Sequence, residues 1–391
     1  MRVSYHNKSY IRPIQVPGSK SITNRLLILK HLFFDNMHID NASDSTDSLS
    51  LRKSLFNQKD GVTKFHVEDG GTTLRFLICY LARTNTASYV TCGSKLFQRP
   101  HDDLITTLNN IGFDIEKTRD GFTLHSVDLA NISAQWDVDI SKSSQFATAL
   151  LLIAPSLNKP ITLSLNGRPV SIGYFDLTVG LMQDLGCSIK RIENSLTILP
   201  MEKNAKTLLA TVEADWSSIS YFVAIARLSN HSLTIQNVNE NSLQPDVNIL
   251  EFAKMIGIDY AFNDSNLILH PTTPYTYPKE IRRDYTNCPD IALTERVICE
   301  ALGIEITATG TEHLKYKESN RSEVIEQELS KFDQATPEFL THNDHRVAMC
   351  LTALSIIKPI QLDDISVVSK SFPDFWQEVS KIGIYLTPDN G

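Results

Sequence analysis

Residues 177–192 read LTVGLMQDLGCSIKRI, and the fold class follows from the pattern in this stretch. Apolar side chains at helical spacing lead up to Leu185, Gly186 comes next, and an alternating segment continues to Ile192. A glycine directly after a helix suits the left-handed conformation in which many helices end. The stretch therefore predicts an amphipathic helix, a sharp reversal of the chain and a strand.

The same pattern recurs along the sequence. Further copies lie at Leu104–Gly112 with Phe113–Lys117, at Ile249–Gly257 with Ile258–Phe262, and at Phe375–Gly383 with Ile384–Leu386. Weaker copies lie at Leu49–Gly61 and Val324–Phe332. Three of the glycines, Gly112, Gly186 and Gly257, are about 70 residues apart, which indicates a repeated α/β unit.

Alternating segments between the helices predict strands with one face covered by helices. They are Ile161–Leu165, Ser195–Leu199, Leu233–Asn237 and Leu267–Leu269. One series of repeats ends and another begins near Ala210–Ser217, so a boundary between two lobes is expected there. A length of 391 residues also suits two large domains.

Composition limits the possible functions. With 42% hydrophobic and 21% charged residues and no apolar run near the roughly 20 residues of a membrane helix, a globular protein is expected. The first residues, Met1–His6, resemble no signal or transit segment, so we expect a cytoplasmic protein. A net charge of −8 argues against nucleic-acid binding, but a local basic cleft can still attract a small anion. The six cysteines show neither zinc-like nor Cys-x-x-Cys spacing, which favours buried thiols and no metal site.

Four segments of the first half suit anion binding. Val16–Arg25 combines a Pro-Gly turn with two serines, Ser19 and Ser21, that can cap a helix expected at Leu26–Phe33. It also carries two cations, Lys20 and Arg25. The glycines of Asp69–Arg75 permit close approach of a ligand. In Gln98–Pro100, the proline suits a first helical turn, with Arg99 at the helix entrance. Ser141–Phe146 offers hydroxyls and an amide at a helix start, and Ser171 and Tyr174 add hydroxyls. Plain capping, a tight turn or a solvated surface residue remains the alternative for each.

The second half adds polar segments around Pro289-Asp290, Lys317–Arg321, Asp344–Arg346 and Lys370–Asp374. Taken with the first half, they supply two carboxylates and five cations: Lys20, Arg99, Arg321, Arg346 and Lys370. Such a set can hold two phosphorylated or carboxylated molecules and move protons between them.

These motifs resemble those of the EPSP synthase family. The matching segments are Pro17–Arg25, Ser143–Phe146, Asp215–Phe222, Asn343–Met349 and Lys370–Asp374, in the order found in the family. The resemblance implies an α/β fold, a two-lobed inside-out α/β barrel in which each lobe has three repeated α/β units with helices inside a ring of sheets. It also implies a lobe 18–213 on the shikimate 3-phosphate side, a lobe 1–17 plus 214–391 that carries the phosphoenolpyruvate and acid/base residues, and an active site in the cleft between them.

The resemblance implies transfer of the enolpyruvyl group of phosphoenolpyruvate to the 5-hydroxyl of shikimate 3-phosphate through a tetrahedral ketal. Matching positions for shikimate 3-phosphate are Lys20, Ser21, Arg25, Ser143, Ser144, Ser171, Tyr174, Asp290 and Lys317. Those for phosphoenolpyruvate are Lys20, Gly71, Arg99, Gln145, Arg321, Arg346 and Lys370. The implied catalytic residues are Lys20, Asp290, Glu318 and His345. No metal, other cofactor, nucleic acid or membrane is implied, and a monomer is expected.

Three positions depart from the family pattern, namely Asp69, His313 and Asn320. Asp69 would repel a phosphorylated anion unless it turns away or pairs with Arg99, and Asn320 lacks the charge that would orient a neighbouring cation. Two alternatives stay open: an enolpyruvyl transferase acting on UDP-N-acetylglucosamine, and an anion-binding homologue with weakened catalysis. Lys20 followed by Ser21 argues against the first, and Asp290 with Glu318 argues against the second.

Overall fold

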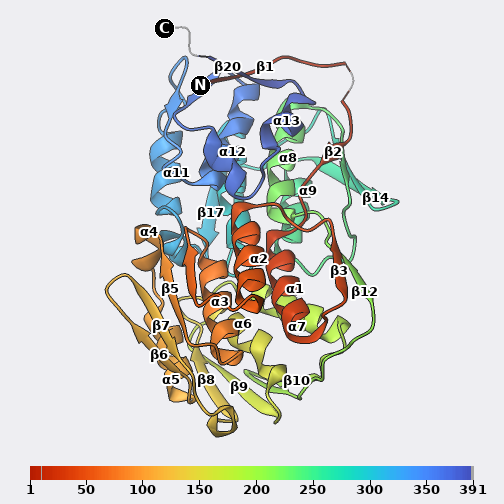
Figure 1. Cartoon of the computed structure of the whole chain (residues 1–391). Coiled ribbons are helices and arrows are strands. Elements are labelled where there is room, and N and C mark those ends of the chain that lie inside the picture. Colours follow the sequence, from red (N-terminus) through yellow and green to blue (C-terminus); the bar gives the residue numbers. More distant parts are fainter. Residues whose placement is uncertain (10, 389–391) are drawn as a thin grey trace. The chain divides into compact units, whose positions relative to one another are not determined.

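The computed structural model describes residues 1–9 and 11–388 and divides the chain into two compact units. The N-terminal unit is Lys20–Val212, and the C-terminal unit combines Met1–Ser19 with Glu213–Gly391 (Figure 1). Each unit has a hydrophobic core of its own. No helix of the described part of the chain is long and apolar enough to span a membrane.

The N-terminal unit contains three sheets within its described residues, with the orders β4-β5-β7-β6, β8-β9-β11-β10 and β3-β12. The strands are β3 (Met37–Asp40), β4 (Lys64–Val67), β5 (Ser88–Cys92), β6 (Asp114–Lys117), β7 (Gly121–His125), β8 (Gln135–Asp139), β9 (Ile161–Asn166), β10 (Ile189–Ile192), β11 (Ser195–Ile198) and β12 (Leu208–Thr211). The helices are α1 (Lys20–Phe33), α2 (Thr46–Lys59), α3 (Gly71–Arg83), α4 (Ser94–Phe97), α5 (Asp102–Asn110), α6 (Ser144–Ile153) and α7 (Ile172–Asp184).

The C-terminal unit repeats this plan, with the sheets β2-β13-β15-β14, β18-β19-β1-β20 and β16-β17 among its described residues. The strands are β1 (Arg2–Tyr5), β2 (Ile14–Gln15), β13 (Leu233–Gln236), β14 (Ile258–Asn263), β15 (Asn266–Pro271), β16 (Glu280–Asp284), β17 (Glu305–Thr309), β18 (Glu338–Phe339), β19 (Ile360–Leu362) and β20 (Ile384–Thr387). The helices are α8 (Trp216–Ser229), α9 (Ile249–Met255), α10 (Ala292–Leu302), α11 (Arg321–Leu329), α12 (His345–Thr352) and α13 (Phe375–Ser380).

The four larger sheets share one pairing pattern, which confirms the predicted repeat. In each sheet the first pair of strands is parallel and the next two pairs are antiparallel. Both two-stranded sheets are parallel. A parallel pair needs a crossover, and the buried helices α3, α6, α10 and α12 supply it between consecutive strands.

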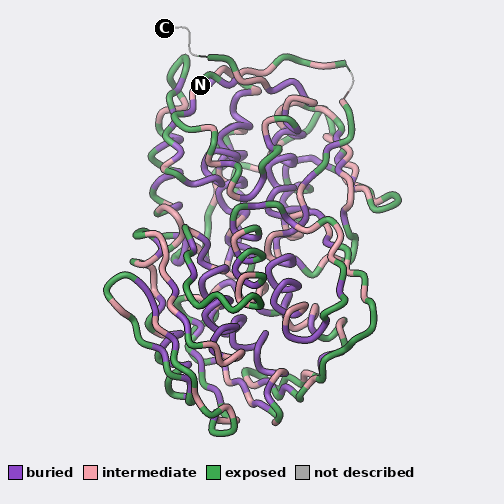
Figure 2. Tube along the Cα trace, in the orientation of Figure 1, coloured by how far each residue is buried: buried purple, intermediate pink, exposed green. Residues whose placement is uncertain are grey.

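The helices that carry most of the buried surface pack against one another inside each unit. In the N-terminal unit these are α1, α3 and α6, and in the C-terminal unit they are α8, α10 and α12. Figure 2 shows buried residues concentrated along these helices. Every residue of Phe146–Ile153 in α6 is buried, because this stretch is apolar around its whole circumference except for Thr148.

Left-handed glycines end the repeated helices, as the sequence predicted. The φ angles are 111° at Gly112, 91° at Gly186, 75° at Gly257 and 111° at Gly383. The weaker copy at Gly61 also holds, with a φ of 80° after α2, whereas α11 ends without a glycine. Sequence reasoning missed one further copy, in which Gly303 (φ 66°) joins α10 to β17. The four alternating segments predicted as strands form β9, β11, β13 and β15.

Candidate active site

The predicted polar residues of the C-terminal unit stand at the starts of helices and in the turns before them. Asp344 accepts a hydrogen bond from the backbone N–H of Arg346 at 3.0 Å and so caps α12. Arg321 is the first residue of α11. The structure brings together seven residues that the sequence singled out: Asp290, Lys317, Glu318, Arg321, His345, Arg346 and Lys370.

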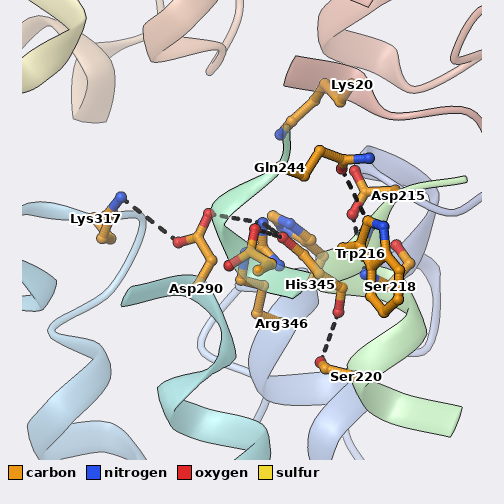
Figure 3. Close-up of polar contacts among 12 residues, drawn as sticks. Lys20, Asp215, Trp216, Ser218, Ser220, Gln244, Asp290, Lys317, His345 and Arg346 are labelled. Carbon is orange, nitrogen blue, oxygen red and sulfur yellow. Dashed lines mark hydrogen bonds and ion pairs between the residues drawn. The ribbon is translucent and has the colours of Figure 1, made fainter. Parts of the chain in front are cut away.

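Asp290 gathers three of the cations. Its carboxylate lies 3.1 Å from Arg321 Nη1, 2.8 Å from Arg346 Nη2 and 3.6 Å from Lys317 Nζ. Figure 3 shows Asp290 between Lys317 and Arg346. Because three cations face one carboxylate, this cluster carries positive charge that an incoming anion can neutralise.

Arg321 is oriented by a second carboxylate. Asp344 is fully buried and accepts hydrogen bonds from Arg321 Nε at 2.8 Å and from Nη2 at 3.2 Å. This two-point contact fixes the plane of the guanidinium. Burial alone would raise the pKa of Asp344, but the charge of Arg321 outweighs it and lowers that pKa. Arg321 therefore keeps Nη1 directed at Asp290.

Glu318 bridges a histidine and a lysine. One carboxylate oxygen lies 2.9 Å from His345 Nδ1 and the other lies 3.2 Å from Lys370 Nζ. Burial would raise the pKa of Glu318, but His345, Lys370 and Arg321 hold it well below its usual value. The carboxylate is therefore ionised at neutral pH and, through His345, has a direct route for a proton.

Arg346 also faces hydroxyl groups of α8. Its Nη1 lies 3.3 Å from the Tyr221 hydroxyl and its Nη2 lies 3.3 Å from Ser217 Oγ. Ser217 in turn donates to Asp246 at 2.8 Å. Burial raises the pKa of Tyr221 far above its usual range, so the hydroxyl keeps its proton. These contacts hold the Arg346 side chain in one orientation.

The surroundings of Asn320 and His313, two of the departures from the family pattern, explain how the site retains its charges. The Asn320 side chain donates to Glu323 at 2.7 Å, and Asp344 and Asp290 provide the negative charge beside Arg321. His313 is buried, and burial together with the charge of Lys317 lowers its pKa to about 4. His313 is therefore neutral at pH 7 and leaves the positive charge to Lys317 and Arg321.

Glu318, Asp344 and His345 also form the kind of group that can bind a metal ion. Their ligand atoms lie within 4.8 Å of one another. Both carboxylates already face cations, since Arg321 contacts Asp344 and Lys370 contacts Glu318. A metal ion would compete with these side chains for the same oxygens.

In the N-terminal unit, α1 carries the two predicted cations Lys20 and Arg25, which differ in their partners. The helix begins at Lys20, so Ser21 lies inside the first turn and does not precede it as a cap would. Lys20 Nζ lies 3.0 Å from Asp47. Arg25 is buried and donates to Thr178 Oγ1 at 2.7 Å, to the Ser21 carbonyl at 2.7 Å and to another carbonyl on α7. Burial lowers the pKa of Arg25 to about 10.

The predicted serines lie at two neighbouring helix starts. Ser143 caps α6 through its hydroxyl, which accepts from the N–H of Gln145 at 3.2 Å. Ser144 donates to the carbonyl of Ser171 at 2.9 Å, and Ser171 has a φ of 53° just before α7. The Tyr174 carbonyl accepts from Arg25 at 2.8 Å. Ser144, Ser171 and Tyr174 therefore come together with Arg25, although they are far apart in the sequence.

Gly71 lies beside two guanidinium groups. A Cβ at Gly71 would be 3.1 Å from Arg99 Nη1 and 3.2 Å from Arg75 Nη1. Sequence reasoning missed Arg75, which donates to Gln145 and to the Pro100 carbonyl, the latter at 3.1 Å. Burial and the neighbouring Arg99 lower the pKa of Arg75 to about 9. Arg75 lies four residues after Gly71 and therefore on the same face of α3, and this spacing could have identified it from the sequence.

The expected helix start at Pro100 is wrong. Helix α5 begins at Asp102, and Arg99 lies in the connection after α4. His101 is buried in this connection, with its Nε2 2.7 Å from the Leu96 carbonyl, and this contact fixes the chain before the helix begins. The arginine is thus placed by a loop packed on α4.

Asp69 is directed at the start of α4. A Cβ at Gly93 would lie 3.1 Å from Asp69 Oδ1. Burial raises the pKa of the Cys92 thiol to about 11, and the charge of Asp69 contributes to the shift. The Asp69 carboxylate therefore faces Gly93, whereas Gly71 faces Arg75 and Arg99.

Comparison with known proteins places the chain in a family. The family model described as EPSP synthase (3-phosphoshikimate 1-carboxyvinyltransferase) matches residues 57–379. A 3-phosphoshikimate 1-carboxyvinyltransferase of Bacteroides fragilis (strain YCH46) is 31% identical over 95% of both chains. The protein of that name from Methanospirillum hungatei is 27% identical over 94% of both chains.

Solved structures show the same fold. An EPSP synthase from Acinetobacter baumannii superimposes with a TM-score of 0.78 over 98% of both chains at 18% identity. The enolpyruvyl transferase NikO from Streptomyces tendae gives a TM-score of 0.69 over 98% of this chain and 97% of that one, at 14% identity. The fold is therefore the two-lobed α/β fold of these proteins, and by sequence and fold the chain belongs to the EPSP synthase family.

Proposed function

We propose that this chain transfers the enolpyruvyl group of phosphoenolpyruvate to the 5-hydroxyl of shikimate 3-phosphate. Membership of the EPSP synthase family supports this reaction. The observation that carries it is the pairing of Glu318 with both His345 and Lys370, because it places a proton-transfer group among cations.

Anion binding follows from the two sets of positive side chains. In this proposal, shikimate 3-phosphate is held by Lys20, Ser21, Arg25, Ser143, Ser144, Ser171, Tyr174, Asp290 and Lys317. Phosphoenolpyruvate is held by Lys20, Gly71, Arg99, Gln145, Arg321, Arg346 and Lys370. In the free protein Asp290 neutralises part of the charge of Arg321 and Arg346, and an anionic substrate takes over that role.

The proton moves through Glu318 and Asp290. Phosphoenolpyruvate draws Lys370 and Arg321 toward its own charge, which weakens their hold on Glu318 and raises its pKa. Glu318 then delivers the proton it shares with His345 to the methylene carbon. Asp290 or Lys20 takes the proton of the 5-hydroxyl, and the 5-oxygen bonds to the central carbon to form a ketal. The bond to phosphate breaks next, and Glu318 recovers a proton from the new methyl group.

The choice of acceptor tests this proposal. The protein is incubated with phosphoenolpyruvate and either shikimate 3-phosphate or UDP-N-acetylglucosamine, and the products are identified by mass spectrometry. We expect an enolpyruvyl product only from shikimate 3-phosphate. A product from the nucleotide sugar alone would contradict the proposal and favour the sister activity.

A further inference from the structure

The turn that leads into α12 has an uncommon backbone. His342 (φ 53°) and Asn343 (φ 58°) are both left-handed, although neither is glycine. Such a conformation costs free energy at each residue and persists only where the surroundings enforce it. The turn is followed at once by Asp344, His345 and Arg346, which belong to the polar cluster.

A buried carboxylate on α11 holds this turn. Glu328 is fully buried and accepts hydrogen bonds from the Leu340 N–H at 2.8 Å, from His342 Nε2 at 2.9 Å and from Lys331 Nζ at 2.6 Å. Asp363 adds a further contact by accepting from the Thr341 N–H at 2.8 Å. The chain is thus fixed immediately before its left-handed residues.

The same face of α11 holds the other end of the turn. Glu328 and Arg321 are about two helical turns apart and so lie on one side of the helix. Arg321 binds Asp344, whereas Glu328 binds Leu340 and His342. Helix α11 therefore grips the segment 340–344 at both ends and sets the direction in which α12 begins.

We propose that Glu328 and His342 are positioning residues that aim the first turn of α12 at the substrates. They act through the backbone of the turn and touch no reacting atom. This role rests on the proposed function, because it assigns His345 and Arg346 to proton transfer and anion binding. It predicts that loss of the Glu328–His342 contact impairs turnover more than it impairs binding of shikimate 3-phosphate.

The test uses the whole protein with Glu328→Gln, His342→Phe and the double variant. Glu326→Gln is the matched control, because it makes the same change on α11 at an exposed pair with Arg296. We expect kcat to fall roughly ten- to a hundredfold in each single variant, since small displacements at a site have effects of this order. The Kd of shikimate 3-phosphate should stay within about twofold of the parent value, and the double variant should lose little more than either single variant.

Hydrogen exchange of the segment 340–346 gives a readout that needs no substrate. Exchange should be faster in Glu328→Gln and His342→Phe than in the parent and in the control. The His342 side chain is 25% exposed. Parent-like exchange or a parent-like kcat in His342→Phe would overturn the role. If Glu328→Gln does not fold, His342→Phe decides the matter. A parent protein without turnover would instead contradict the proposed function, and the exchange measurement would then decide the role of Glu328 and His342 alone.

Discussion

Glu318 illustrates how one side chain acquires a role from its neighbours. Its carboxylate is 15% exposed and is shared between His345 and Lys370. A solvated glutamate would have neither a fixed proton route nor a depressed pKa. The surrounding cations keep it ionised, and in the proposed function an anionic substrate competes for these cations.

Removing this charge should stop proton transfer while binding survives. Glu318→Gln keeps the shape of the side chain but cannot exchange a proton, so we expect turnover to fall by roughly two to four orders of magnitude. Steady-state kinetics measure the fall, and calorimetry with shikimate 3-phosphate measures binding. Glu323→Gln is the control, since Glu323 is exposed and bonded to Asn320. Near-normal turnover in Glu318→Gln would remove this residue from the mechanism.

Asp69 offers a second test at a single position. Asp69 precedes Gly71 by two residues in the chain, and negative charge close to a bound anion opposes its binding. Asp69→Asn should therefore lower the Michaelis constant for phosphoenolpyruvate and leave that for shikimate 3-phosphate nearly unchanged. An unchanged or higher constant for phosphoenolpyruvate would show that Asp69 does not limit binding.

Among the elements, the helix–glycine–strand repeat brings distant parts of the chain together. Every copy except the one at α11 ends its helix in a left-handed glycine, after which the chain turns into a sheet. Two of these helices begin beside predicted site residues: α7 starts directly after Ser171, and α10 follows the turn that contains Asp290. The repeat supplies the scaffold, and the sequence of each helix start supplies the chemistry.

The glycines that end these helices should differ in how well they tolerate a side chain. A Cβ at Gly383 would lie 2.0 Å from the His6 carbonyl oxygen, whereas a Cβ at Gly303 would meet no atom within 4 Å. Gly303→Ala should cost about 1–2 kcal/mol for the left-handed backbone alone. Gly383→Ala should cost about 1–3 kcal/mol more, because β1 must move away from β20. Urea unfolding measures both, and equal losses would contradict the account of the clash.

Features that depend on neighbouring residues in the sequence were predicted better than features that depend on contacts made in the folded chain. The helix ends followed from local pattern, and copies with a clear apolar residue before glycine were found, although Gly303 was missed. The start of α5 was predicted wrongly, because the packing of His101 on Leu96 is not visible in local spacing. Arg75 was overlooked for a related reason. It is placed beside Gly71 by hydrogen bonds to Gln145 and to the Pro100 carbonyl, and these contacts form only when the chain folds.

At the scale of the whole molecule, the polar cluster should influence the acid stability of the protein. The pKa of Glu318 is lowered from an ordinary value of 4.5, so its ionised form stabilises the folded state above that pH. This contribution is lost as the pH falls through the lower folded value. The difference in unfolding free energy between the parent and Glu318→Gln should therefore be constant near neutrality and shrink below pH 4.5. The measurement runs from pH 7 down over about 4 pH units. If the difference in unfolding free energy between the parent and Glu318→Gln stays constant over this range, the lowered pKa of Glu318 is contradicted.

Each unit carries a set of cationic side chains, and the proposed function assigns both sets to one reaction. The most direct measurement is phosphate release by the purified protein with shikimate 3-phosphate and phosphoenolpyruvate together, and with each omitted in turn. We expect release only when both are present, together with formation of 5-enolpyruvylshikimate 3-phosphate. No release, despite calorimetric binding of shikimate 3-phosphate, would contradict the claim and indicate an anion-binding homologue without turnover.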